Sequence, residues 1–345
     1  MRLLFITQKV DRSDDLLGVY HEWIKELALR AKQIHVICLY EGESDLPSNV
    51  FVYSLGKEIG RSRLKYLWRF FVYLWRRRSE YDEVFVHMNP EYVVLAGWWW
   101  RLTRKKITFW YAHYLKTWQL VIASWFADQI LTSVTQAFPF SSLKVKAVGQ
   151  GIDVERFCLV PRVRPSQPIR LLFVGRISPV KDLLTLIEAA RELQSRQIPF
   201  VLNIVGEPGE KDHQYFDQVK LKISQAEIDD RVFWLRKRPN NQMPEIYQEH
   251  DLYINLTRTG SFDKTTLEAM ACGCLVLTAN QAFFDVLPAL WSDDHVFREG
   301  DPIDLADRIS GLLGRDGLFW SQRGQDLRDI IVENHSLKRL MNKLI

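Results

Sequence analysis

The sequence predicts an α/β protein made of two tandem, Rossmann-like, doubly wound domains that face each other across a cleft. The chain has 345 residues, and single hydrophobic cores stop growing before that length. In both halves, short apolar runs alternate with amphipathic helical patterns, which is typical of parallel sheets covered by helices. The alternation breaks at residues 161–168, where three prolines stand without a periodic apolar pattern.

These observations place the first domain at residues 1–160, a linker at 161–168 and the second domain at 169–325. Residues 326–345 are expected to form a C-terminal helix that packs back on the first domain. The strands of the first domain are expected at 2–7, 34–40, 50–55, 83–88, 107–112, 129–134 and 145–148, and its helices at 15–31, 62–78, 91–104 and 116–126. The strands of the second domain are expected at 169–174, 200–205, 231–235, 251–256 and 275–278, and its helices at 183–196, 214–226, 241–249 and 264–271.

The composition narrows the classes of partner. Hydrophobic residues make up 47% of the chain and charged residues 26%, which argues against long disordered segments. The net charge of +4 suits an anionic small ligand or an anionic membrane surface and is too small to favour nucleic acid. The four cysteines include no second pair at zinc-ligand spacing, so we expect buried thiols and no metal site. Because no apolar run approaches the roughly 18 residues of a membrane span, we expect a cytoplasmic protein.

A first group of candidate site residues follows the strand at 169–174. The strand ends at Gly175, and a helix is expected to start near Lys181. The free N–H groups and positive end of a helix favour an anion. Arg176 offers a bidentate fork for phosphate oxygens, and Lys181 offers a point charge. The alternative interpretation is a solvated turn that carries two surface cations.

A second group surrounds the helix expected at 264–271. Asp263 is expected to cap that helix with its side chain, and Gly273 suits the position after its C-terminus. Glu268 lies among apolar neighbours, where an ionised carboxylate needs a partner. The alternative interpretation is a capped helix with one exposed glutamate.

Together these segments resemble a known family. Gly175-Arg176-x4-Lys181, followed by Leu267-Glu268-Ala269-Met270-Ala271-x-Gly273, is similar to glycosyltransferase family 4, the retaining group 1 enzymes of GT-B fold. Residues 149–157 resemble the end of that family's N-terminal domain, and residues 205–208 resemble its turn after the second strand of the donor domain. The resemblance covers nearly the whole chain, and the order of these segments makes it specific.

The resemblance implies a nucleotide-diphosphate sugar as donor. Arg176 and Lys181 would neutralise the diphosphate as it leaves, and Glu268 would hold the ribose. The backbone near Arg238 would face the base, and the amides around Asp263 would cradle phosphate or sugar. The expected donor-binding residues are Gly175, Arg176, Lys181, Arg238, Phe262, Asp263, Lys264, Thr265 and Glu268.

The resemblance also implies a histidine that faces the transferred sugar. His113 occupies that place after the strand at 107–112 and is a candidate catalytic residue beside Arg176 and Lys181. The alternative is a core histidine. His87 is the weaker candidate, and a structural role is expected for it.

The sequence departs from the family at several positions of the sugar site. Gly260 stands where a second glutamate is usual, eight positions before Glu268, and Asp263 replaces a usual glycine. Asp182 likewise follows the lysine at a position that is often glycine. We hypothesise that Asp263 or Lys264 takes over part of the sugar or phosphate contact.

A basic and aromatic segment lies at residues 61–78. Its apolar side chains at helical spacing are Leu64, Leu67, Trp68, Phe71, Leu74 and Trp75. A second patch combines Leu95, Trp98 and Trp99 with cations at positions 101, 104, 105 and 106. Such helices dock on anionic bilayers. A crossover helix that packs the stripe on its own sheet explains residues 64–75 equally well.

The sequence therefore predicts a metal-independent, retaining hexosyltransferase. Its donor would be a UDP-, GDP- or ADP-sugar, with no further cofactor, and its acceptor a glycan or a lipid-linked molecule of cell-surface polysaccharide or glycolipid synthesis. Nucleic acid is not expected as a partner, whereas peripheral contact with the inner face of a membrane is. Gly260 motivates the alternative of a non-catalytic nucleotide-sugar-binding protein. A sugar-nucleotide epimerase of the same fold is a third hypothesis.

Overall fold

The computed structural model describes the chain except for residues 15–16, 61, 258–261 and 345. The chain forms two compact units. The first unit contains Met1–Gly151 together with the residues from Leu337 on, and the second contains Ile152–Ser336. The prediction of two parallel-sheet α/β domains is confirmed.

The first unit is a seven-stranded parallel sheet in the order β3-β2-β1-β4-β5-β6-β7. The order reverses between β1 and β4, which makes the sheet doubly wound. Its strands are β1 (Arg2–Val10), β2 (Gln33–Glu41), β3 (Val50–Ser54), β4 (Glu83–His87), β5 (Lys106–Trp110), β6 (Gln129–Thr132) and β7 (Val145–Ala147). Its helices are α1 (Gly18–Ala28), α2 (Arg63–Arg76), α3 (Pro90–Leu102), α4 (Trp118–Phe126) and α12 (Leu337–Leu344).

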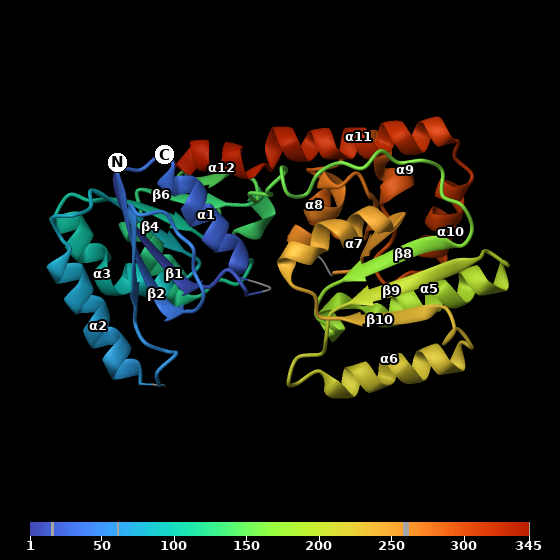
Figure 1. The fold of residues 1–345 in the computed structure, drawn as a ribbon, viewed down its shortest axis with the longest axis horizontal. Coiled ribbons are helices and arrows are strands. Elements are labelled where there is room, and N and C mark those ends of the chain that lie inside the picture. Colours follow the sequence, from blue (N-terminus) through green and yellow to red (C-terminus); the bar gives the residue numbers. More distant parts are fainter. Residues whose placement is uncertain (15–16, 61, 258–261, 345) are drawn as a thin grey trace. The chain divides into compact units, whose positions relative to one another are not determined.

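The end of the chain returns to the first unit through α12, which lies beside α1 (Figure 1). Leu340 and Met341 of α12 are fully buried in the core cluster that contains Trp23 of α1. The backbone passes close to this contact at Gly151, where a Cβ would lie 2.6 Å from Leu340. Residues 326–345 therefore contain the end of one helix and the whole of a second, and it is the second that joins the first unit.

The second unit is a five-stranded parallel sheet in the order β10-β9-β8-β11-β12 (Figure 1). Its strands are β8 (Ile169–Val174), β9 (Phe200–Val205), β10 (Val232–Arg236), β11 (Leu252–Asn255) and β12 (Leu275–Thr278). Its helices are α5 (Leu183–Ser195), α6 (His213–Gln225), α7 (Met243–Glu249), α8 (Lys264–Ala271), α9 (Ser292–His295), α10 (Pro302–Leu313) and α11 (Gly317–Asn334). The strands are buried apolar runs, as expected for a sheet with helices on both faces.

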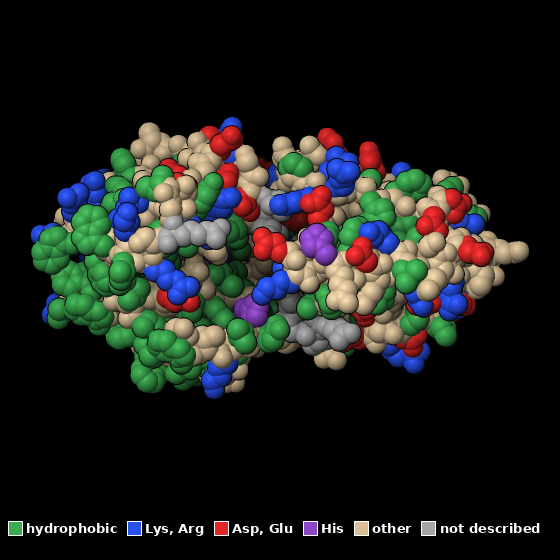
Figure 2. Space-filling view, turned by 90° about the horizontal axis from the view of Figure 1, so that it is seen from below, with side chains coloured by type: hydrophobic (Ala, Val, Ile, Leu, Met, Phe, Trp, Pro, Cys, Tyr) green, Lys and Arg blue, Asp and Glu red, His purple; other side chains and the backbone are tan. Residues whose placement is uncertain are grey.

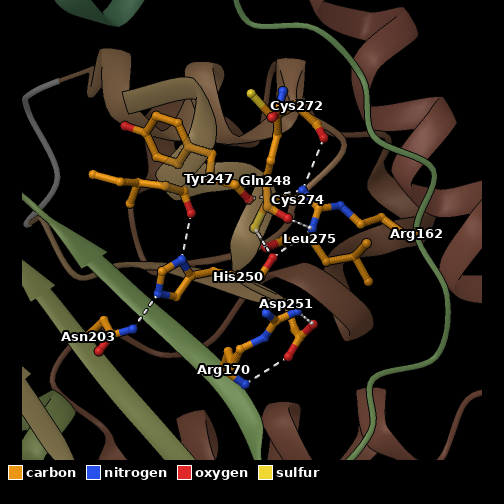
Figure 3. A network of polar contacts seen from close by, with 11 residues as sticks. Arg162, Arg170, Asn203, Tyr247, Gln248, His250, Asp251, Cys272, Cys274 and Leu275 are labelled. Atoms are coloured by element: carbon orange, nitrogen blue, oxygen red, sulfur yellow. Dashed lines mark hydrogen bonds and ion pairs between the residues drawn. The ribbon is translucent and has the colours of Figure 1, made fainter. Parts of the chain in front are cut away.

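Residues 161–168 belong to the second unit, where the sequence had suggested a linker between domains. The reason lies at Arg162, whose side chain is buried. Its guanidinium donates to the carbonyls of Tyr247, Gln248 and His250 at the end of α7, and to that of Cys272 at the end of α8 (Figure 3). A cation is favourable at these helix ends, because their last carbonyls lack partners within the helix.

The described helices include none that is long and apolar enough to cross a membrane.

Candidate functional site

The candidate site of the second unit lies where β8 and β11 end. These strands are parallel neighbours in the sheet, so the loops that follow them leave the same edge. The loop after β8 leads through a short 3-10 turn (Pro179–Lys181) into α5, and the loop after β11 leads to α8. This topology brings Lys181 and Asp263 together although 82 positions separate them.

Lys181 is held by an ion pair. Its Nζ lies 2.6 Å from Oδ2 of Asp263 and 2.8 Å from Oγ1 of Thr257. Asn255 donates to the same Oδ2 at 3.2 Å, and the Thr257 hydroxyl also donates to it. The Lys181 and Asp263 side chains keep only 18% and 13% of their exposure. The lysine expected to meet phosphate is therefore already paired with a carboxylate of the protein.

Asp263 occupies the N-cap position of α8, but its side chain accepts no capping bond from the helix. The prediction that this side chain caps the helix is wrong; the carboxylate instead binds Lys181, Thr257 and Asn255 through its Oδ2. Asn255 and Thr257 had not been singled out. Their position as buried polar residues at the end of a predicted strand was the available signal.

Gly175 lies beneath the Lys181 side chain, since a Cβ at Gly175 would be 3.5 Å from its Cε. Gly206, at the end of β9, has a φ of +140°, and a Cβ there would lie 1.9 Å from the carbonyl oxygen of Gly175. The turns after β8 and β9 can approach this closely only because residue 206 is glycine.

Arg176 projects from the same turn. Its side chain is 66% exposed, and its Nε lies 3.8 Å from Oδ2 of Asp212. A guanidinium that is exposed and only loosely paired can bind an incoming anion at little cost.

Glu268 is buried and has the partners that its apolar surroundings require. Its Oε1 lies 3.1 Å from Nζ of Lys264, one turn earlier on α8. Its Oε2 accepts a hydrogen bond of 3.1 Å from the Tyr247 hydroxyl. Burial, and then the adjacent carboxylate, raises the pKa of Tyr247 well above its ordinary value, so this phenol stays a donor. The expectation that Glu268 needs a partner is confirmed, and Tyr247 is a residue that local sequence patterns could not assign.

Three other predicted donor-binding residues differ in their exposure and in their contacts. Thr265 shares a hydrogen bond of 2.8 Å with Tyr253. Phe262 is buried, and its ring packs 4.8 Å from that of Phe283. Arg238 is exposed two residues after β10, with its Nε bonded to the Leu235 carbonyl. The structure therefore brings Lys264 and Glu268 together in one pair, and Lys181 and Asp263 in another.

Two departures from the family pattern have different outcomes. Gly260 lies outside the described residues. Asp182 adopts the left-handed conformation with φ 46° and ψ 47°, which explains why glycine is common at that position. Its carboxylate accepts a hydrogen bond of 2.9 Å from Thr185 in the first turn of α5. Local bonding of this kind lets aspartate tolerate the conformation.

The two histidines of the first unit differ in exposure. His113 is exposed in the loop after β5, where its Nδ1 accepts a hydrogen bond of 3.0 Å from the Leu115 amide. His87 is buried at the end of β4, and its ring centroid lies 3.8 Å from that of Tyr20. Burial lowers the pKa of His87 to about 3, so it is neutral and part of the core at neutral pH.

Comparison with known proteins finds a family similarity in the second unit. Residues 161–323 match the family described as glycosyl transferases group 1. A D-inositol 3-phosphate glycosyltransferase of Nocardia farcinica is 32% identical to the chain over 186 residues, which are 51% of this chain and 41% of that protein. The match thus spans less than half of that relative.

Solved structures of low sequence identity show the same fold over the whole chain. Anabaena Alr3699/HepE, in complex with UDP and glucose, has a TM-score of 0.75 at 15% identity, with 100% of this chain and 98% of that chain covered. The lipopolysaccharide outer core galactosyltransferase WaaB in its apo form has a TM-score of 0.72 at 14% identity, with 100% and 98% covered. The GT-B fold predicted from the resemblance is therefore confirmed.

Proposed function

We propose that the protein is a retaining, metal-independent glycosyltransferase that moves a hexose from a nucleotide-diphosphate sugar to a glycan or a lipid-linked acceptor. The observation that carries the proposal lies at the edge of the second sheet. Lys181 is paired there with Asp263 at the N-cap of α8, the helix that carries the buried Glu268, and Arg176 is exposed in the loop after β8. Support comes from the group 1 family match and from a structural neighbour that was solved with UDP and glucose.

In this proposal the two cations stabilise the diphosphate as the bond to the sugar breaks. Arg176 can form two parallel bonds to phosphate oxygens, whereas Lys181 contributes a point charge. Fixed charges of this kind are a large source of transition-state stabilisation. No additional cofactor is needed for this step, since the leaving group departs as an anion that these side chains neutralise.

Glu268 would accept hydrogen bonds from the ribose hydroxyls. An ionised carboxylate offers about four acceptor sites, so the bonds from Tyr247 and Lys264 leave capacity for a ligand. Tyr247 fixes the carboxylate in one orientation.

Asp263 would supply the carboxylate that the family's usual glutamate provides at the position of Gly260. Lys181, Thr257 and Asn255 all bind Oδ2 of Asp263, and within the described part of the chain Oδ1 is left to accept a sugar hydroxyl. Asp263 would then connect the phosphate and sugar halves of the donor site, because the same carboxylate orients Lys181. This choice favours Asp263 over Lys264, whose ammonium pairs with Glu268.

On the acceptor side, we place His113 near the transferred sugar and the reaction in cell-surface polysaccharide or glycolipid synthesis at the cytoplasmic face of a membrane. His113 is exposed, and its Nδ1 is fixed by the Leu115 amide, so Nε2 can face a ligand.

The proposal is tested in two steps. A thermal-shift screen with UDP, GDP, ADP and their hexose derivatives names the donor, since a ligand of the native state raises its stability. The donor is then incubated with and without candidate glycan and lipid-linked acceptors. Acceptor-dependent release of the nucleoside diphosphate with retention at the anomeric carbon supports the proposal. Inversion of the donor sugar without acceptor would indicate an epimerase, and tight binding without turnover a non-catalytic binding protein.

A further inference from the structure

The first unit exposes a continuous apolar surface on α2 and α3, here named the α2–α3 face. Figure 2 shows hydrophobic side chains gathered at the end of the first unit, interspersed with Lys and Arg. Its tryptophans are Trp68, Trp75 and Trp98, which are 66%, 58% and 54% exposed. The α2–α3 face consists of Leu64, Leu67, Trp68, Phe71, Trp75, Trp98 and Leu102.

The exposed side chains of α2 are not displaced core residues. Phe70 and Leu74 turn toward the core and are 1% and 3% exposed. The residues at 64, 68, 71 and 75 fall within about 60° of the helix circumference, on a side away from Phe70 and Leu74. Of the two interpretations of this helix, packing on its own sheet accounts for Phe70 and Leu74 and leaves the other stripe exposed.

Aromatic contacts join the two helices into one surface. The Trp75 ring lies 5.7 Å from that of Trp99 on α3, and Trp99 lies 6.0 Å from Trp98. The guanidinium of Arg78 stacks 4.4 Å above Trp75. The surface is therefore a continuous aromatic patch with a cation at its border.

The charge along α2 has one sign. Residues 62–79 contain six Lys and Arg and no Asp or Glu. Arg63, Lys65 and Arg76 are exposed along α2. Tryptophan rings settle at the headgroup level of bilayers, and nearby cations attract anionic lipids. A protein partner would have to offer an extended acidic and apolar surface, whereas an anionic bilayer supplies both features over its whole area.

We propose that the α2–α3 face binds the surface of an anionic phospholipid bilayer, with its tryptophans in the interfacial layer and its cations against lipid phosphates. This inference goes beyond the transfer reaction, because it concerns where the protein works and does not depend on the donor site.

The test is flotation of the 345-residue protein with vesicles of phosphatidylcholine alone and with vesicles in which phosphatidylglycerol replaces part of the phosphatidylcholine. Wild-type protein should bind the anionic vesicles at least about tenfold more strongly. The variant W68A/W75A and the variant K65E/R76E should each lose about tenfold or more of that binding. Both remove exposed side chains, so circular dichroism and the thermal shift with the donor nucleotide should match those of wild-type protein.

Matched controls are L29A/L318A, at two leucines that are each 76% exposed, and K32E/K211E, at two exposed lysines. Neither should alter vesicle binding. Equal binding of wild-type protein to neutral and anionic vesicles, or no binding to either, would overturn the proposal. A dimer seen by light scattering would also overturn it, if W68A/W75A dissociates the dimer and leaves vesicle binding unchanged. The α2–α3 face would then bind a second copy of the chain.

Discussion

The Nζ atom of Lys181 lies 2.6 Å from Oδ2 of Asp263, so the cation expected at the donor phosphate is bonded to a carboxylate of its own chain. Thr257 and Asn255 hold the same oxygen. A carboxylate beside a diphosphate weakens phosphate binding by repulsion, and a contact with another part of the ligand can offset that cost. The two effects of Asp263 can therefore be measured separately as changes in ligand affinity.

We expect Asp263→Asn to affect binding of the diphosphate and binding of the sugar differently. Binding of the nucleoside diphosphate should be unchanged or tighter, because a negative charge is removed. Binding of the sugar nucleotide should weaken by about 1.5–3 kcal/mol, the usual contribution of a charged hydrogen bond. Calorimetric titration with both ligands measures the difference. Asp229→Asn, at an exposed carboxylate, should change neither affinity, and equal losses for both ligands would contradict the sugar contact.

Arg176→Ala should weaken binding of the nucleoside diphosphate by about 1.5–3 kcal/mol, since a bidentate charged contact is lost. Stability should change little, because the side chain is 66% exposed. Arg191→Ala is a matched control, with a side chain that is 64% exposed on α5. An unchanged affinity of the Arg176 variant would place the phosphate elsewhere.

Tyr247→Phe removes the hydroxyl that holds Oε2 of Glu268. The free energy of unfolding should fall by about 1–3 kcal/mol, because a buried carboxylate loses a partner, and nucleotide affinity should fall as well. Tyr81→Phe provides the comparison, since Tyr81 accepts a buried hydrogen bond of 3.3 Å from Trp100 in the first unit. It should lower stability in urea titrations without changing nucleotide affinity. A normal affinity of the Tyr247 variant would argue against Glu268 as the ribose ligand.

Arg162→Met should lower the free energy of unfolding of the second unit by about 3 kcal/mol, since four carbonyls at the ends of α7 and α8 lose a buried donor. Arg164→Met is the control, because Arg164 is exposed and donates to a single carbonyl, that of Leu313. Urea titrations of both variants measure the difference. Similar small losses would mean that water replaces the guanidinium without cost.

Acid should destabilise the first unit through His87. Its folded pKa of about 3 lies below the unfolded value of about 6.5. The stability that the neutral ring contributes is therefore complete above pH 6.5 and is lost as the pH falls toward 3. At pH 5 the loss from this group should be about 2 kcal/mol.

His87→Gln removes this titration. The difference in unfolding free energy between wild-type protein and the variant should shrink by about 2 kcal/mol between pH 7 and pH 5, as measured by urea titration at each pH. A difference that stays constant with pH would show that His87 is not buried in its neutral form.

Much of the fold could be predicted because its signals are local. Strands β8, β9 and β12 begin and end at the predicted residues, since each is a short apolar run closed by a turn. Helix α8 also has its predicted bounds, and Gly273 follows it with a positive φ of 70°. Periodicity could not show that the helical end of the chain is divided, nor that only α12 packs into the first core.

The sequence by itself determined two α/β domains and the identity of Arg176, Lys181 and Glu268 as candidate donor residues, because the spacing of these motifs lies within single strand-loop-helix segments. Only the tertiary structure decided how they are paired. Lys181 meets Asp263 because β8 and β11 are adjacent, Glu268 meets Tyr247 because α7 packs on α8, and Arg162 binds helix ends more than 80 residues away. Such pairings follow from the order of strands in the sheet, which local patterns of polarity do not encode.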